Sequence, residues 1–412
     1  MGVEAAAVDA AYERLRDVVA RTPLQRHERV SARTGAQVWL KREDLQVVRS
    51  YKLRGAYNLL AQLEGEQRDV VCASAGNHAQ GVAFACRALD LHAKIFLPRT
   101  TPRQKRDRIA LLGGDRVQTI VGGDTYDVAS AAAREEAART GALMVPAFDH
   151  PDVIAGQGTV AREIVEQLGH APDVLVVPVG GGGLIAGITA WLAKHHPTTR
   201  VIGVEPSGAA SMAAALAAGE PVELAELDGF VDGAAVRKVG AHTYDVLAGA
   251  QVDLRTVDAG VLCEEMLDLF DIDGVIAEPA GALAPAALRA GGLVNPGETV
   301  VAVVSGGNHD VSRYAEVMER ALVSRGVKHY FLVEFPQEPG ALRRFLNDVL
   351  GPDDDITLFE YVKRTNREIG PALVGLELGA PEDLAPLLER LAASPITAQK
   401  LSPDDPAFRF LV

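Results

Sequence analysis

The sequence is poor in cysteine and contains no long uninterrupted apolar run. Its 412 residues include three cysteines, Cys72, Cys86 and Cys263, whose odd number and wide spacing exclude a disulfide framework and a cysteine metal site. Buried thiols in a reducing compartment are expected instead. No apolar run reaches about 18 residues, so we expect no transmembrane helix. The N-terminal residues lack the basic and apolar segments of a signal peptide, which predicts a cytoplasmic protein.

Basic residues are also in short supply. The chain has 41 lysines and arginines against 55 aspartates and glutamates, and its formal net charge is −14. Nucleic-acid binding requires a basic face, so no nucleic-acid partner is expected. Small anionic ligands remain compatible with this net charge, because a local site can be positive while the whole chain is negative. A chain of this length predicts two or three domains.

Apolar, β-branched segments alternate with longer helical patterns from residue 52 to about residue 320. Several of these segments are apolar on both faces, which is typical of parallel strands covered by helices. The alternation predicts an α/β fold of open twisted sheets with helices on both faces. Ligands in such sheets bind beyond the carboxyl ends of the strands. The expected strands are residues 37–41, 70–74, 93–97, 117–121, 173–179, 201–204 and 299–305.

Three glycine-rich turns each follow such a strand and lead into a helical pattern, and a lysine segment precedes them. Free N–H groups at the start of a helix can hold an anion, and a desolvated lysine amine can act as nucleophile and base. One reactive amine with three anion-binding turns is suited to bind pyridoxal 5′-phosphate (PLP) and an amino-acid carboxylate. The segments are Ser50-Tyr51-Lys52-Leu53-Arg54, Ser74-Ala75-Gly76-Asn77-His78, Gly180-Gly181-Gly182-Gly183-Leu184 and Ser305-Gly306-Gly307-Asn308.

The tetraglycine turn also allows a different interpretation. Gly181, Gly183 and Ala186 fit a dinucleotide fingerprint, and Glu205 ends the next strand where a ribose-binding acid would stand. A nicotinamide enzyme would leave Lys52 and the other two turns unexplained, so PLP is favoured. A catalytically inactive amino-acid sensor is a further alternative, against which the intact Lys52 and Ser305 argue.

The four segments, in this order, resemble the fold-type II PLP enzymes, and most closely the biosynthetic threonine dehydratases (threonine ammonia-lyases). The resemblance implies conversion of L-threonine to 2-oxobutyrate and ammonia, the first step of isoleucine biosynthesis. Serine and threonine lyases share these motifs, so L-serine is a second expected substrate, and a degradative lyase or a racemase-like enzyme is the alternative. In related serine racemases a proton-donating serine occupies the position of Ala75, and alanine favours elimination over racemisation.

The same resemblance assigns roles to individual residues. Lys52 is the catalytic residue and forms a Schiff base with the cofactor. The expected substrate-binding residues are Ser74, Ala75, Gly76, Asn77 and His78. Apart from the resemblance, Arg54 allows two interpretations, a contact with a phosphate or carboxylate and a structural ion pair, of which the ion pair is favoured. A monovalent cation is a further expectation, at Glu205, the carbonyl of Ala209 and Ser211. The cofactor-binding residues are Lys52, Tyr51, Asn77, Gly180, Gly181, Gly182, Gly183, Leu184, Gly233 and Ser305.

The pattern changes near residue 325. Strands at 330–335, 356–363, 372–378 and 396–401, with a helix after residue 338 and another at 381–393, predict a βαββαβ ferredoxin-like unit. Its Phe335-to-Leu342 turn resembles the ACT-like regulatory domain of threonine dehydratases, in a single copy. The expected domains are residues 1–325, with a small subdomain at about 41–145, and residues 326–412. The resemblance implies inhibition by isoleucine, opposed by valine, and a homo-oligomer, either dimer or tetramer. An oligomerisation domain is the alternative role.

Overall fold

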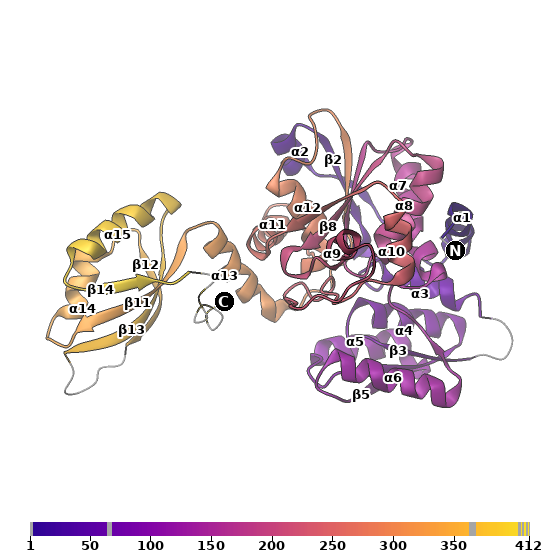
Figure 1. Ribbon diagram of the computed structural model, residues 1–412, viewed down its shortest axis with the longest axis horizontal. Coiled ribbons are helices and arrows are strands. Elements are labelled where there is room, and N and C mark those ends of the chain that lie inside the picture. Colours follow the sequence, from indigo (N-terminus) through magenta and orange to yellow (C-terminus); the bar gives the residue numbers. More distant parts are fainter. Residues whose placement is uncertain are drawn as a thin grey trace. The chain divides into compact units, whose positions relative to one another are not determined.

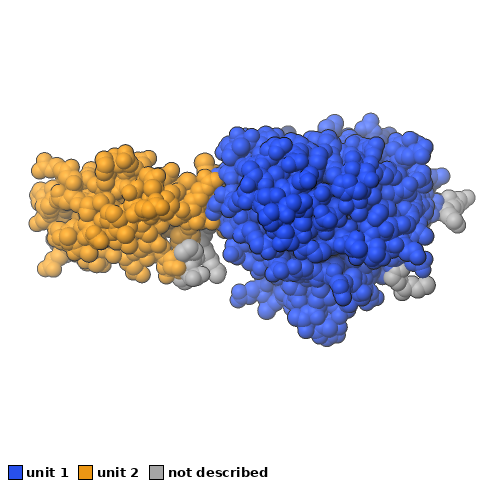
Figure 2. Space-filling model, turned by 90° about the horizontal axis from the view of Figure 1, so that it is seen from above, with its two compact units in different colours: residues 1–310 blue, residues 311–412 orange. Residues whose placement is uncertain are grey.

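The computed structural model describes residues 3–63, 68–361 and 368–402, together with residues 405, 408 and 411. The chain divides into two compact units, residues 1–310 and 311–412, which Figures 1 and 2 show as a ribbon and as a space-filling view. The predicted domain boundary at residue 325 and the predicted subdomain limits stay predictions. Among the described residues, no helix is long and apolar enough to cross a membrane.

The large sheet of the first unit has six strands in the order β1-β2-β10-β7-β8-β9. All neighbours are parallel except β1, which runs antiparallel to β2. The inner strands are almost entirely apolar and buried, as expected when helices cover both faces. The strands are β1 (Leu24–Arg26), β2 (Gln37–Arg42), β10 (Thr299–Val304), β7 (Val174–Pro178), β8 (Arg200–Pro206) and β9 (Val252–Val257).

A second, smaller sheet is formed by residues that lie between β2 and β7 in the sequence. Its order is β5-β4-β3-β6 and all of its pairings are parallel. The strands are β5 (Val117–Val121), β4 (His92–Leu97), β3 (Asp69–Ala73) and β6 (Leu143–Met144), and the helices that follow them in this part of the chain are α4 (Asn77–Leu89), α5 (Arg103–Gly113) and α6 (Tyr126–Thr140).

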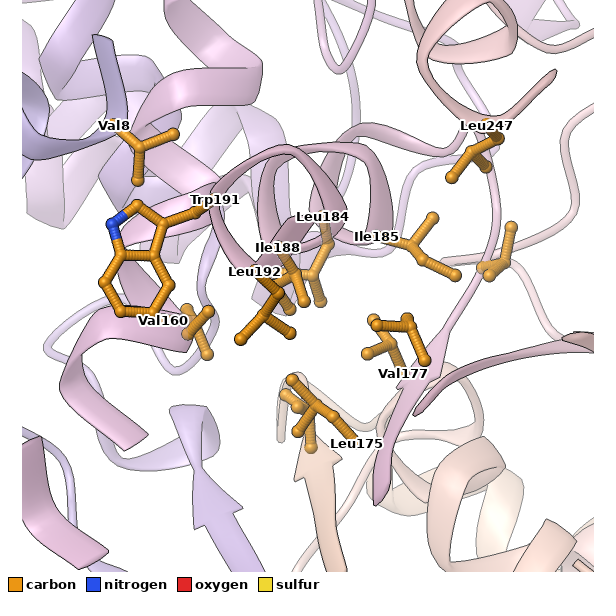
Figure 3. Close-up of a cluster of buried hydrophobic side chains, with 14 of the residues drawn as sticks. Val8, Val160, Leu175, Val177, Leu184, Ile185, Ile188, Trp191, Leu192 and Leu247 are labelled. Atoms are coloured by element: carbon orange, nitrogen blue, oxygen red, sulfur yellow. The ribbon is translucent and has the colours of Figure 1, made fainter. Parts of the chain in front are cut away.

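Alternate residues of the large-sheet strands face opposite helical layers. Leu175 and Val177 of β7 pack with Val160, Ile185 and Ile188 in one buried apolar cluster, which Figure 3 shows. Helix α12 covers the other face, against β7, β8, β9 and β10. The helices of the cluster include α1 (Ala5–Leu15), α7 (Pro151–Leu168), α8 (Gly183–His195), α9 (Ser211–Ala218) and α10 (Ala241–Ala248), and those of the other layer are α2 (Glu28–Thr34), α11 (Ala259–Asp271) and α12 (Pro279–Ala290).

The second unit contains an antiparallel sheet in the order β12-β13-β11-β14. The chain order βαββαβ confirms the predicted ferredoxin-like fold, and Phe331, Phe335, Phe345 and Val374 lie in its core. Residues 362 and 363, predicted as part of a strand, lie outside the described residues. The elements are α13 (Tyr314–Ser324), β11 (Lys328–Pro336), α14 (Ala341–Arg344) with a π-helical turn at Phe345–Val349, β12 (Asp355–Tyr361), β13 (Ile369–Glu377), α15 (Leu384–Ala393) and β14 (Thr397–Lys400).

Candidate active site

Lys52 is the first residue of helix α3 (Lys52–Leu60). Its Nζ donates a hydrogen bond of 3.0 Å to the carbonyl of Ala147 and lies 5.2 Å from the centre of the Tyr51 ring. The lysine segment is tied to the third glycine-rich turn, because the Tyr51 N–H donates to the Ser305 carbonyl at 3.2 Å. Ser50 forms a further bridge with Gly306. Two segments that are some 250 positions apart in sequence (50 to 306) therefore meet at the end of strand β10.

The first and third glycine-rich turns are joined through Asn77. Its Oδ1 accepts from Asn308 Nδ2 at 2.6 Å, and its Nδ2 donates to Glu278 Oε1 at 2.5 Å. The backbone N–H of Glu278 donates to the Gly306 carbonyl at 3.1 Å. These bonds fix which edge of the Asn77 amide is the donor. The second proton on Nδ2 remains able to bond an oxygen of a ligand.

Glu278 is a buried carboxyl at the centre of this arrangement. Burial, and then the negative charge of Asp232, raise its pKa to about 7, although the hydrogen bond from Asn77 acts in the opposite direction. Lys105 forms an ion pair of 3.0 Å with Asp232 and also opposes the rise. A Cβ on Gly233 would lie 2.9 Å from Ala280 Cβ and 3.8 Å from Glu278 Oε1, so this predicted cofactor-binding residue lies beside the same carboxyl.

The tetraglycine turn leaves no room for side chains. Gly182 adopts a left-handed conformation, with φ of +90°, which favours glycine. A Cβ on Gly181 would lie 2.4 Å from the ring of Phe148, and one on Gly180 would lie 2.9 Å from Ala234 Cα. The turn leads directly into α8, where Leu184 is buried. Its backbone N–H groups can therefore approach an anion closely at a helix N-terminus.

Ser305 and His78 are buried near the lysine. Ser305 follows β10 directly and its Oγ donates to the Ala280 carbonyl at 3.3 Å. His78 Nε2 lies 2.9 Å from the Val145 carbonyl and so carries a proton. Burial, and then the positive charge of Lys52, lower the pKa of His78 to about 4. The imidazole is neutral at physiological pH, while Ser74, Ala75 and Gly76 are half-buried beside it.

The predicted cation ligands also lie together, at the start of α9. The carboxylate of Glu205 is fully buried and accepts from the N–H groups of Met212 at 2.7 Å and Ala213 at 2.9 Å. Burial raises its pKa to about 7 despite these bonds. Within the described part of the chain, the buried Oγ of Ser211 has no hydrogen-bond partner. Ala209 is buried at the end of the preceding turn.

A second acidic cluster is paired with a cation of the protein itself. His27, Glu265 and Asp273 are the only group of three metal-type ligands in the described residues. The Arg29 guanidinium bonds Glu265 at 2.6 Å and Asp273 at 2.7 Å, so a cation of the protein already pairs with both carboxylates. These contacts indicate a structural ion pair rather than a metal centre.

One segment of the site could not be predicted from the sequence. Residues 145–149 supply the carbonyls that bond His78 and Lys52 and the ring of Phe148 that lies against Gly181. Asp149 accepts from the first two N–H groups of α10, at 3.0 and 2.8 Å. Backbone carbonyls carry no sequence signature. The strand that precedes this segment has only two residues, so it could not mark the segment as a strand end. The prediction that Arg54 forms a structural ion pair is confirmed, because Arg54 is buried between Glu43 and Glu163.

Comparison with known proteins identifies the class. The family of pyridoxal-phosphate dependent enzymes matches residues 15–306, and the C-terminal regulatory domain of threonine dehydratase matches residues 319–411. The fold and the site thus define a PLP-dependent enzyme with an appended regulatory domain. The cradle of side-chain-free backbone, the half-buried Lys52 and the buried hydroxyl of Ser305 fit that cofactor.

The relatives identify the particular family. The biosynthetic L-threonine dehydratase of Mycobacterium tuberculosis (strain ATCC 25618 / H37Rv) is 61% identical over 98% of this chain and 95% of its own. That of Bacillus subtilis (strain 168) is 48% identical over 98% and 96%. The chain belongs to the biosynthetic L-threonine dehydratases, which confirms the predicted family, fold type and cofactor.

Solved structures agree with this assignment. The processed form of threonine deaminase isoform 2 from Solanum lycopersicum matches with a TM-score of 0.73 and 39% identity, covering 78% of this chain and 96% of that one. Maize serine racemase matches with a TM-score of 0.71 and 29% identity, covering 78% and 99%. The fold is therefore shared by lyases and racemases, and the residues of the site must decide between these reactions.

Proposed function

We propose that this chain converts L-threonine to 2-oxobutyrate and ammonia, as the first step of isoleucine biosynthesis, with Lys52 as the catalytic residue. The observation that carries the proposal is the convergence of the Lys52 segment, the Asn77 turn and the Ser305 turn through direct hydrogen bonds. PLP, when bound, supplies an electron sink for the substrate carbon that loses its proton. The protein supplies the base, the orientation and the anion-binding groups.

Lys52 has the central role in moving protons. Its Nζ would hold the cofactor in the resting enzyme, and its free amine would then take the proton from the substrate Cα. The carbonyl of Ala147, 3.0 Å away, orients this amine by accepting its hydrogen bond. His78 is neutral because its pKa is about 4, so it adds no positive charge beside the lysine. These contacts suit a lysine that alternates between nucleophile and base.

The remaining site residues are assigned to binding. N–H groups at the start of α4, in the turn from Ser74 to His78, would hold the substrate carboxylate. Asn77 would donate to the 3′-oxygen of PLP, with Tyr51 and Gly233 beside the ring. The turn Gly180–Gly183 and Leu184 would hold the phosphate. Glu205, the Ala209 carbonyl and Ser211 would hold a monovalent cation. The buried carboxylate supports this assignment, as does the Ser211 hydroxyl, which has no hydrogen-bond partner among the described residues.

Two residues suit elimination, and one of them, Ala75, also disfavours racemisation. Ser305 would bond the pyridine nitrogen, and a hydroxyl does not keep that nitrogen protonated as a carboxylate would. The weaker electron sink suits prompt loss of the β-hydroxyl. Ala75 stands in the substrate turn and has no proton to donate from a second face. The same features apply to L-serine, which we propose as a second substrate.

The second unit is proposed to bind the effectors. Its match to the regulatory domain of threonine dehydratase supports inhibition by isoleucine, with valine opposing it. Allostery requires two states with different effector affinities. We further propose a homo-oligomer, dimer or tetramer, in which such states can interconvert. We propose that it is cytoplasmic.

A direct assay tests the proposed function. Incubation with L-threonine should release 2-oxobutyrate, and L-serine should release pyruvate more slowly. Isoleucine should lower the rate with L-threonine, and removal of residues 328–412 should leave turnover but abolish that inhibition. The 2-oxo acids can be measured with a coupled dehydrogenase. No oxo acid from either substrate would refute the catalytic proposal, whereas inhibition that persists in the truncated chain would refute only the regulatory one.

We predict that Glu278 makes a pH-dependent contribution to the free energy of unfolding. Its pKa of about 7 in the folded chain exceeds the ordinary 4.5, so folding favours the protonated form. That contribution is fully present below pH 4.5 and is lost as the pH rises through 7. Glu278→Gln keeps an acceptor for Asn77 but cannot ionise. Between about pH 5 and pH 8, we expect its free energy of unfolding to fall by roughly 2 kcal/mol less than that of the parent, measured by urea unfolding. Equal losses in the two proteins would contradict the assigned protonation.

A further inference from the structure

The carbonyl groups of the phosphate-binding turn must point away from the phosphate. A loop that holds an anion through N–H groups must direct its carbonyl oxygens elsewhere, because their partial negative charge repels the anion. The Gly182 carbonyl accepts from the Ala186 N–H at 2.9 Å and is occupied within the start of α8. The carbonyl of Gly181 precedes the helix and has no such helical partner. A side chain from a different element binds it.

That side chain is Thr243, in the first turn of α10. Its Oγ1 donates to the Gly181 carbonyl at 2.8 Å and lies 3.0 Å from the Gly240 carbonyl. A hydroxyl has one proton, and the shorter distance is the one to the glycine turn. Thr243 is completely buried. A carbonyl without a partner at this depth would be costly, so the Gly181 carbonyl depends on the Thr243 hydroxyl.

The turn rests directly on this side chain. A Cβ on Gly182 would lie 3.0 Å from Thr243 Cβ and 2.6 Å from Met212 Cε, so both side chains contact the left-handed residue of the turn. Phe148 contacts the turn at Gly181, where its ring would lie 2.4 Å from an added Cβ. The turn is therefore held by close packing as well as by one side-chain hydrogen bond.

Helix α10 is itself held in place. Asp149 accepts from the N–H groups of Ala241 and His242, at 3.0 and 2.8 Å, and so caps the helix that carries Thr243. Asp149 directly follows Phe148, which packs on the turn. One short segment thus sets the position of the turn and of the helix beneath it, and Thr243 links the two.

We propose that Thr243 is a positioning residue for PLP: its hydroxyl keeps the Gly181 carbonyl turned toward α10, so that N–H groups are left to face the cofactor phosphate. This inference rests on the proposed function, in which Gly180–Gly183 hold that phosphate. Thr243 touches neither the substrate nor the reacting atoms in this account. It acts on how long the enzyme retains its cofactor.

Three variants of the full-length holoenzyme test the proposal. Thr243→Val has nearly the same shape and lacks the hydroxyl, whereas Thr243→Ser keeps the hydroxyl. Thr189→Val is the matched control, because Thr189 is also buried, lies in α8 after the same turn, and has an Oγ1 without a hydrogen-bond partner among the described residues. The readout is the rate of PLP release, followed by absorbance while a phosphatase destroys free PLP.

We expect Thr243→Val to release PLP on the order of tenfold faster, the effect of one lost buried hydrogen bond. Thr243→Ser and Thr189→Val should release it within about twofold of the parent, and all four proteins should share one KM for L-threonine at saturating PLP. Equal release from Thr243→Val and the parent would overturn the inference, as would equal acceleration in Thr243→Val and Thr189→Val. If Thr243→Val fails to fold, accelerated release from Thr243→Ser would overturn the inference and parent-like release would support it. Failure of the parent to bind PLP would instead overturn the proposed function.

Discussion

Replacing Lys52 by alanine should abolish the conversion of L-threonine, with kcat reduced by roughly 10⁴-fold or more. The variant loses both the amine that would hold PLP and the base that would take the Cα proton. The tetraglycine turn does not depend on the lysine side chain, since its contacts are with Phe148, Ala234, Met212 and Thr243. The variant should therefore fold and still bind PLP, although without a covalent bond. The measurement is steady-state release of 2-oxobutyrate.

A matched control separates this role from the loss of a positive charge. Lys94 lies on β4 and pairs with Glu136 at 2.6 Å, with 42% of its side chain exposed. Lys94→Ala should keep the activity of the parent within about twofold, since surface ion pairs contribute little to stability. Lys52→Arg should be as inactive as Lys52→Ala, because a guanidinium stays protonated and cannot act as the base. Turnover by either Lys52 variant at the parent's rate would refute the assignment.

Replacing Arg54 by methionine should destabilise the chain by about 3–5 kcal/mol, because it would leave buried carboxylates without their partner. The Arg54 guanidinium is completely buried and donates four hydrogen bonds to Glu43 and Glu163, at 2.8–2.9 Å. Burial alone would raise the pKa of Glu43, but Arg54 lowers it to about 2. Lys41, 2.6 Å from Glu163, is the neighbouring cation and would remain. Urea unfolding measures the loss.

The Arg54 cluster also connects stability with catalysis. Arg54 stands two residues after Lys52 on α3, and its partners belong to the turn after β2 and to α7. Arg162→Met is a suitable control, because its partners Asp9, Glu13 and Glu166 are 37%, 56% and 39% exposed and its loss should cost about 1 kcal/mol or less. If Arg54→Met unfolded at the same urea concentration as Arg162→Met, the cluster would not have the structural role assigned to it.

Most of the fold could be predicted because its inner strands are long and apolar. The segments at 70–74, 93–97, 173–179 and 299–305 correspond to β3, β4, β7 and β10. The prediction missed β1 and β6, which have three and two residues and show no periodicity. It also missed β9, an edge strand in which exposed and half-buried residues alternate. Short edge strands are defined by their pairing partners, which lie far away in the sequence.

The site was predictable to the extent that it lies at strand ends. Each glycine-rich turn was found because one or more glycines stand between an apolar strand and a helix. Thr243 and Asp149 had no such signal, since a single threonine or aspartate at a helix start is usually an ordinary cap. Their contacts with Gly181 and α10 exist only in three dimensions. The link between Glu278 and Asn77 is similar, because it joins residues 201 positions apart.

The central claim is that the ε-nitrogen of residue 52 carries the cofactor. Borohydride reduction of the holoenzyme, followed by proteolysis and mass spectrometry, tests it most directly, because reduction makes the bond between lysine and PLP permanent. The account predicts one phosphopyridoxyl group, on the peptide that contains Lys52. A modified lysine elsewhere, with Lys52 recovered unmodified, would contradict it.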